Sequence, residues 1–179
     1  MKKIIAFLMI LGFASSSCEP DDICDPSTPT TPRMLIQFFD ISNPSVRKNV
    51  TNLKVIGEGK TEGVVFNPSG IDEAKYLTSA DSILLPLNTD ADIVKYKFIL
   101  NSGNKNPLLV NTDNLEFKYT RESKYVSRAC GFKTIYDLDS VNPFVLSDTT
   151  PADEMWIHYV IVAKNKITSE NETIIKIFF

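Results

Sequence analysis

Three cysteines and one histidine are the residues of this sequence best suited to chemistry. Cys18, Cys24, Cys130 and His158 are too widely separated to match the ligand spacing of a zinc site. The histidine lies in an apolar segment, residues 156–162, so we expect a core or interfacial side chain rather than a catalytic base. The sequence also lacks the Gly-x-Ser-x-Gly, phosphate-loop and His-Glu-x-x-His motifs. We therefore predict no catalytic residue and no cofactor.

The first 17 residues have the pattern of a signal peptide. Two lysines follow Met1, and the apolar run from Ile4 to Ala14 is shorter than the roughly 20 residues that a spanning helix needs. Three serines then lead directly to Cys18, as in the lipobox of a bacterial lipoprotein, although Ser15 stands where leucine is usual. An ordinary secretory signal with a nearby cysteine is the alternative. We predict cleavage before Cys18 and attachment of diacylglycerol and a further acyl chain such as palmitate, which together anchor stably.

Loss of residues 1–17 would leave 162 residues, with 17 basic against 22 acidic side chains and a net charge of −5. That length suits one domain with a core of its own. The acidic balance argues against nucleic acid and against an anionic membrane surface as partners. The expected contact with a membrane is therefore the N-terminal lipid.

If Cys18 carries lipid, the two remaining cysteines form an even pair in an oxidising envelope compartment. We predict a disulfide between Cys24 and Cys130, which are 106 residues apart and would gain about 4–5 kcal/mol in the chain-entropy description. A metal-binding thiolate pair or a free nucleophilic cysteine are the alternatives.

The sequence divides into a signal peptide (residues 1–17), an acidic, proline-rich tether (18–32) and one domain (33–179). In residues 93–100, apolar and aromatic side chains alternate with Lys95 and Lys97, which is typical of a strand with one buried face. Pro86 cannot donate to a sheet and indicates an edge strand. Strands are predicted at residues 34–40, 53–57, 82–87, 93–100, 115–121, 124–130, 132–138, 156–163 and 173–179.

Between these strands we expect a turn at residues 121–123, a loop over 139–153 and one or two helical turns within 67–80. Residues 156–162 are apolar on both faces, which predicts a central strand. Short strands at this spacing, with no amphipathic helix, indicate an all-β fold. We predict an antiparallel β-sandwich, immunoglobulin-like or a related Greek key.

A weak metal candidate lies in the turn at Asn88-x-Asp90-x-Asp92, whose oxygens are the kind that calcium prefers. The EF-hand pattern fails there, because Ile93 stands in place of the required glycine and Ile99 in place of the bidentate glutamate. A solvated turn is the simpler interpretation, and we predict no metal.

Two clusters carry a resemblance to a known family: Asp21-Asp22-Ile23-Cys24 with residues 30–40, and Ser127-Arg128-Ala129-Cys130-Gly131-Phe132. Together with Leu84-Leu85-Pro86-Leu87-Asn88, they make the mature chain resemble a family of uncharacterised lipoproteins of Bacteroidota, classed as a domain of unknown function. The resemblance supports lipidation and the pairing of the two cysteines, and it implies no activity. Acids just after Cys18 also resemble the signal that exports lipoproteins of that phylum to the cell surface.

These observations predict a lipid-anchored envelope protein of the outer membrane, on either its periplasmic or its outer face. We expect a non-catalytic binding or assembly module with a protein or glycan partner of the envelope. The alternative is an envelope hydrolase that acts on glycan or peptide through two carboxylates, about 5–9 Å apart for glycoside chemistry.

Overall fold

The computed structural model describes residues 23–28, 30–149, 152 and 154–179, so the predicted signal peptide and Cys18 lie outside the described residues. The described chain falls into two compact units. We call residues 23–28 and 124–133 the tip unit, and residues 30–123 and 134–179 the sandwich unit. Across the described ranges, no helix has both the length and the apolar character needed to cross a membrane.

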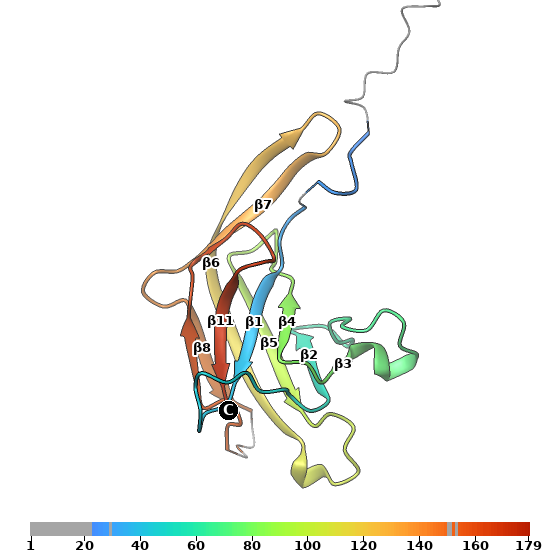
Figure 1. Cartoon of the computed structure of the whole chain (residues 1–179), viewed down its shortest axis with the longest axis vertical. Helices are drawn as coiled ribbons and strands as arrows, with labels where there is room; N and C mark the ends of the chain where they lie inside the picture. Colours follow the sequence, from blue (N-terminus) through green and yellow to red (C-terminus); the bar gives the residue numbers. More distant parts are fainter. Residues whose placement is uncertain (1–22, 29, 150–151, 153) are drawn as a thin grey trace, which may run out of the picture. The chain divides into compact units, whose positions relative to one another are not determined.

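The smaller sheet of the sandwich unit has four strands. Their order is β4 (Ser82–Leu85), β1 (Met34–Phe39), β11 (Thr173–Phe178) and β9 (Tyr159–Val162). Figure 1 shows β1 between β4 and β11. The β1–β11 pair is parallel, with Ile36 opposite Ile175, which departs from the purely antiparallel arrangement expected. The other two pairs are antiparallel.

The larger sheet has seven strands. Its path is β10 (Lys166–Ile167), β7 (Gly131–Leu138), β6 (Asn111–Ser127), β5 (Ile93–Leu100), β2 (Leu53–Gly57) and β3 (Leu77–Thr78), with β8 (Phe144–Asp148) paired to β6. Two 3-10 helices, η2 (Asp72–Tyr76) and η3 (Pro107–Leu109), lie in its connections. No α-helix occurs in the described part of the chain. The prediction of an all-β sandwich is confirmed.

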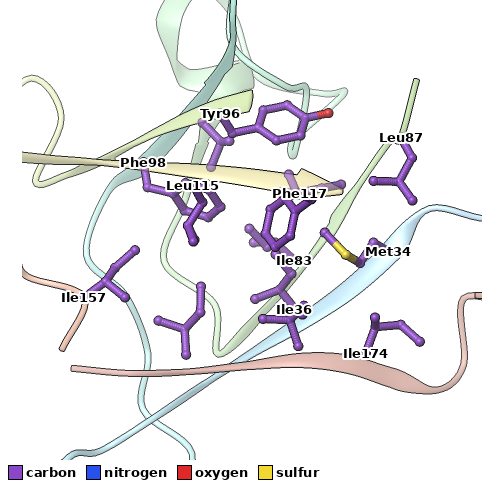
Figure 2. Packing of buried hydrophobic residues seen from close by; sticks show 14 of the residues in the cluster. Met34, Ile36, Ile83, Leu87, Tyr96, Phe98, Leu115, Phe117, Ile157 and Ile174 are labelled. Atoms are coloured by element: carbon purple, nitrogen blue, oxygen red, sulfur yellow. The ribbon is translucent and has the colours of Figure 1, made fainter. Parts of the chain in front are cut away.

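Alternation along the strands places one face of each sheet in a shared core. On β5, Tyr96 and Phe98 are buried while Lys95 and Lys97 are exposed, as the sequence pattern predicted. Figure 2 shows side chains of both sheets packed together. The labelled residues in that view are Met34, Ile36, Ile83, Leu87, Tyr96, Phe98, Leu115, Phe117, Ile157 and Ile174.

A polar anchor fixes the connection into β9. The carboxylate of Asp113 on β6 is fully buried and accepts a 2.7 Å hydrogen bond from the backbone N–H of Ile157. The indole Nε1 of Trp156 donates to the carbonyl of Phe98 on β5 at 3.1 Å. A buried N–H that lost its acceptor would be costly, so Asp113 secures the chain where it passes between the sheets.

The chain reverses later than expected between β6 and β7. A turn at residues 121–123 followed by a strand at 124–130 is wrong: β6 runs unbroken through Ser127, and the chain turns at residues 128–130. Gly131 follows with φ +67°, a conformation that glycine adopts readily. Residues 121–123 contain no glycine, proline or asparagine, so nothing local stops the strand there.

Two further expectations are wrong. Residues 139–153 are not all loop, because β8 forms within them against β6. The apolar segment at 156–162 is not central: β9 lies at the edge of its sheet, with Tyr159 37% and Ile161 45% exposed. Trp156 and Ile157 are buried in succession before the strand begins, so His158 is exposed rather than in the core.

Candidate functional site

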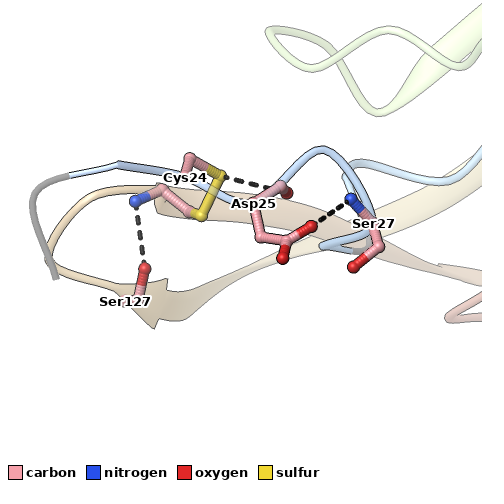
Figure 3. Close-up of a disulfide and its surroundings, with 5 residues drawn as sticks. Cys24, Asp25, Ser27 and Ser127 are labelled. Atoms are coloured by element: carbon pink, nitrogen blue, oxygen red, sulfur yellow. Dashed lines mark hydrogen bonds between the residues drawn. A yellow bond between two sulfur atoms is a disulfide. The ribbon is translucent and has the colours of Figure 1, made fainter. Parts of the chain in front are cut away.

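A disulfide joins the two segments of the tip unit. Cys24 and Cys130 are bonded with a Cα–Cα distance of 4.8 Å, within the usual range, so this predicted pairing is confirmed. Figure 3 shows the bond at the turn between β6 and β7. The cysteine that we expected to carry lipid, Cys18, is only six residues before Cys24 in the sequence.

Local hydrogen bonds shape both sides of this bond. On the hairpin, the Cys130 N–H donates to the hydroxyl of Ser127 at 3.0 Å (Figure 3). On the other segment, a carboxylate oxygen of Asp25 accepts from the Ser27 N–H at 2.8 Å, and the Asp25 carbonyl accepts from Thr28. The Ser27 backbone hydrogen bond lowers the pKa of Asp25 from its usual value. These contacts form a compact turn immediately after Cys24.

The hairpin of the tip unit also carries two exposed aromatic rings. Tyr125 on β6 is 63% exposed and Phe132 on β7 is 69% exposed. The two rings meet edge to face at 5.4 Å. On the same two strands within the sandwich unit, Tyr119 and Tyr136 also meet edge to face, but they are 3% and 1% exposed. The exposed pair is therefore a feature of the tip unit and not of the strands in general.

In the sandwich unit, an open groove of about 670 Å³ lies beside β2 and β5 of the larger sheet. We call it the sheet groove; residues 57–64 after β2, residues 86–88 and the start of β5 line it. A second hollow of about 310 Å³ shares Glu58, Lys95 and Tyr96 with it and extends over β6 and β8. The combined surface is open and of mixed polarity, which suits a polymer or a protein segment better than an enclosed small molecule.

Charged side chains form a chain of ion pairs along this surface. Lys95 Nζ lies 3.3 Å from a carboxylate oxygen of Glu116, its cross-strand partner, and 3.8 Å from one of Glu58. Lys118 Nζ lies 3.6 Å from the other oxygen of Glu116. Because these side chains are partly or largely exposed, the pairs add little stability, which leaves them able to exchange partners with a ligand.

Two tyrosine hydroxyls hold residues 86–88 beside the sheet groove by hydrogen bonds. Tyr96 is 5% exposed and its hydroxyl donates to the carbonyl of Pro86, and burial raises its pKa. The hydroxyl of Tyr119 donates to the Asn88 carbonyl at 3.2 Å and accepts from the Asn88 N–H at 2.8 Å. Burial raises the pKa of Tyr119 to about 12, so both hydroxyls remain neutral donors at ordinary pH.

Of the weak calcium candidates, Asn88 lines this groove, and the side chains of Asn88 and Asp92 have protein contacts. Asn88 Oδ1 accepts from the Asp90 N–H at 2.8 Å, which closes the turn. Asp92 Oδ1 is 2.6 Å from Arg121 Nε, and the same guanidinium donates to the Thr89 carbonyl at 2.6 Å. Among the described residues, no three His, Cys, Asp or Glu side chains group as a metal site would require.

Sequence reasoning did not single out the exposed tip aromatics or the Glu58–Lys95–Glu116 chain. The ion pairs arise from cross-strand register, Lys95 opposite Glu116, which local alternation does not reveal. The spacing of Tyr125 and Phe132 around a Gly-containing turn was the available signal, and it was hidden by the misplaced hairpin.

The comparisons with known proteins agree with a family of undetermined activity. No curated protein and no solved structure matches the chain. A family of unknown function, DUF6452, matches residues 52–179, which include every strand of the larger sheet together with β4, β9 and β11. That match spans well over half of the sequence, so the chain belongs to the DUF6452 family of unknown function.

Proposed function

We propose that this chain is a lipid-anchored protein of the bacterial cell envelope, held at the outer membrane through Cys18, and that it acts as a non-catalytic binding or assembly module. The observation that carries the proposal is the Cys24–Cys130 disulfide. Disulfides persist in oxidising compartments outside the cytosol, which is where a signal peptide would deliver the chain.

The sequence before that disulfide supports the lipid anchor. A basic start, an apolar run and three small residues precede Cys18 in the order required for lipoprotein processing. With Cys24 and Cys130 joined, Cys18 is the remaining thiol of the three in the sequence. Cys18→Ala should abolish incorporation of a palmitate analogue, whereas Cys24→Ala should still be labelled. Continued labelling of Cys18→Ala would contradict the anchor.

The sheet groove supports a binding role. It offers an open surface of about 670 Å³ with both charges and apolar side chains, including Ile93, which is 46% exposed. Lys95 lines the groove and has two carboxylates as exchangeable partners. An envelope protein or glycan that presents its own charges can replace these partners without leaving a buried group unpaired.

Crosslinking in intact envelopes tests this role. The wild-type protein should recover the same envelope component repeatedly, and Lys95→Glu should weaken that recovery because it reverses a charge that lines the groove. Lys105→Glu is the matched control, since it makes the same charge change on an exposed loop outside the groove. Recovery of the protein alone, or equal recovery with both variants, would contradict a binding role for the groove.

An envelope hydrolase is the second candidate, and one observation favours it. Oxygens of Glu58 and Glu116 lie 3.8 Å and 3.3 Å from the same Lys95 Nζ, so they are at most about 7 Å apart, an upper limit compatible with the separation used in glycoside hydrolysis. The lysine ammonium contacts both carboxylates, which is the arrangement of an ion-pair network rather than of an acid and a base. Hydrolysis of envelope glycan that is lost in Glu116→Gln and kept in Glu172→Gln would favour the enzyme; no hydrolysis by the wild type would remove it.

A further inference from the structure

We propose that the two exposed aromatic rings of the tip unit, Tyr125 and Phe132, insert into the headgroup region of the bilayer that holds the lipid of Cys18. The inference rests on the proposed lipid anchor and adds a second, non-covalent contact with the same membrane. The occupant of this aromatic surface is thus a lipid bilayer rather than a soluble partner.

The exposure of the rings is the first argument. Tyr125 and Phe132 contact each other at 5.4 Å, yet about two-thirds of each side chain remains in water. A sandwich core is already available to aromatic rings on these strands, as buried Tyr119 and Tyr136 demonstrate. Exposed, paired aromatics on a hairpin end mark a contact surface, and tyrosine in particular favours the boundary between water and lipid.

The covalent path is the second argument. Cys130 lies between the two rings in sequence and is bonded to Cys24, six residues after Cys18. Six residues span at most about 20 Å even when fully extended. A lipid on Cys18 therefore restricts the disulfide, and the hairpin end that carries it, to a shallow layer next to the bilayer. This restriction gives the rings a high effective concentration at the membrane surface.

Local charge is the third argument. Residues 124–133 contain Lys124, Arg128 and Lys133 and no acid, whereas the chain as a whole has a net charge of −3. Cations beside interfacial aromatics extend toward lipid phosphates while their stems cover apolar surface. The acidic balance of the whole chain argues against an anionic surface as a general partner, but residues 124–133, which carry both rings, have the opposite sign. The described residues of the tip unit have three basic side chains against one acid, Asp25.

A tryptophan probe tests the inference in the acylated full-length mature protein, reconstituted in vesicles of phosphatidylethanolamine and phosphatidylglycerol. Phe132→Trp keeps an aromatic ring at the tip, and brominated phospholipids quench a tryptophan that enters the bilayer. The native Trp156 is 7% exposed in the sandwich core, so the unsubstituted protein supplies the background emission. Leu108→Trp is the matched control, because Leu108 is 90% exposed and apolar but belongs to the sandwich unit.

We expect brominated lipid to quench the emission added by Phe132→Trp and to leave that added by Leu108→Trp almost unchanged. Adding Tyr125→Ser to Phe132→Trp should lower the equilibrium constant for insertion of the tip into the bilayer about tenfold. This is the effect of losing the transfer of one largely exposed ring into an apolar phase. Binding of the protein to the vesicles is measured by flotation in the same samples. Flotation without quenching of Phe132→Trp would overturn this inference and leave the lipid anchor intact, whereas failure of the wild type to float would overturn both.

Discussion

Removal of the Cys24–Cys130 bond is the sharpest perturbation of stability that the structure offers. The bond joins residues 106 apart, and the loop between them contains all of the strands from β1 to β6. In the chain-entropy description, opening a loop of that length lowers the free energy of unfolding by about 4.8 kcal/mol. This is an upper value, because without the bond the short segment at residues 23–28 regains backbone freedom in the folded state.

Guanidinium chloride unfolding, followed by the emission of Trp156, measures the effect. With a slope of about 4 kcal/mol per molar denaturant, a loss of 3–5 kcal/mol moves the midpoint down by about 1 M. Cys24→Ser, Cys130→Ser and reduction of the wild type should give the same midpoint, because each opens the same bond. Ser127→Ala is the control, since it removes only a hydrogen bond to the Cys130 N–H. A midpoint that shifts by less than about 0.2 M would refute the loop-closure reasoning.

Three other predictions concern the sandwich unit. Asp113→Ala leaves the buried Ile157 N–H without its acceptor and should lower the free energy of unfolding by about 2–3 kcal/mol, read from urea midpoints; an unchanged midpoint would contradict its role as an anchor. Burial raises the pKa of Tyr119 to about 12 in the folded chain, above the unfolded value of about 10, so stability should be complete below pH 10 and fall as the pH rises toward 12. Tyr119→Phe should flatten that decline, and an equally steep decline would argue against it. Lys95→Met should change stability by less than about 1 kcal/mol, because its ion pairs are exposed, and a loss above 2 kcal/mol would show that they are structural.

Local patterns in the sequence were sufficient for several elements. β2 and β5 have the predicted bounds, because alternation between apolar and polar residues reports one buried face. β4 is an edge strand that ends at Leu85, directly before Pro86, which cannot donate to a neighbour. The disulfide was predictable from cysteine count and compartment, since it depends on neither strand order nor register.

The errors arose where pairing between distant segments decides the outcome. β8 forms because residues 144–148 pair with β6. Taken alone, this short segment carries little strand signal. The apolar segment at 156–162 predicted a central strand, but β1 and β11 occupy the centre of that sheet. These two strands come from opposite ends of the domain's sequence and pair in parallel, which local patterns do not reveal. β9 is left at the edge and His158 in water.

The two candidate surfaces were missed for the same reason as β8, because both depend on pairing between strands. The groove depends on the register that sets Lys95 opposite Glu116, and the tip surface depends on where the hairpin turns. Both are properties of strand pairing, so composition and spacing did not reveal them. The lipid anchor at Cys18 can be proposed from sequence alone, because processing enzymes recognise a short linear segment rather than a folded surface.

The intact mass of the protein extracted from envelope membranes shows whether the chain is cleaved before Cys18 and acylated on it. We expect a chain that begins at Cys18, lacks residues 1–17, and carries diacylglycerol and further acyl mass on that residue, with Cys24 and Cys130 together two hydrogen atoms lighter than two free thiols. A chain that begins at another residue, or one that begins at Cys18 without acyl mass, would contradict the proposed lipid anchor.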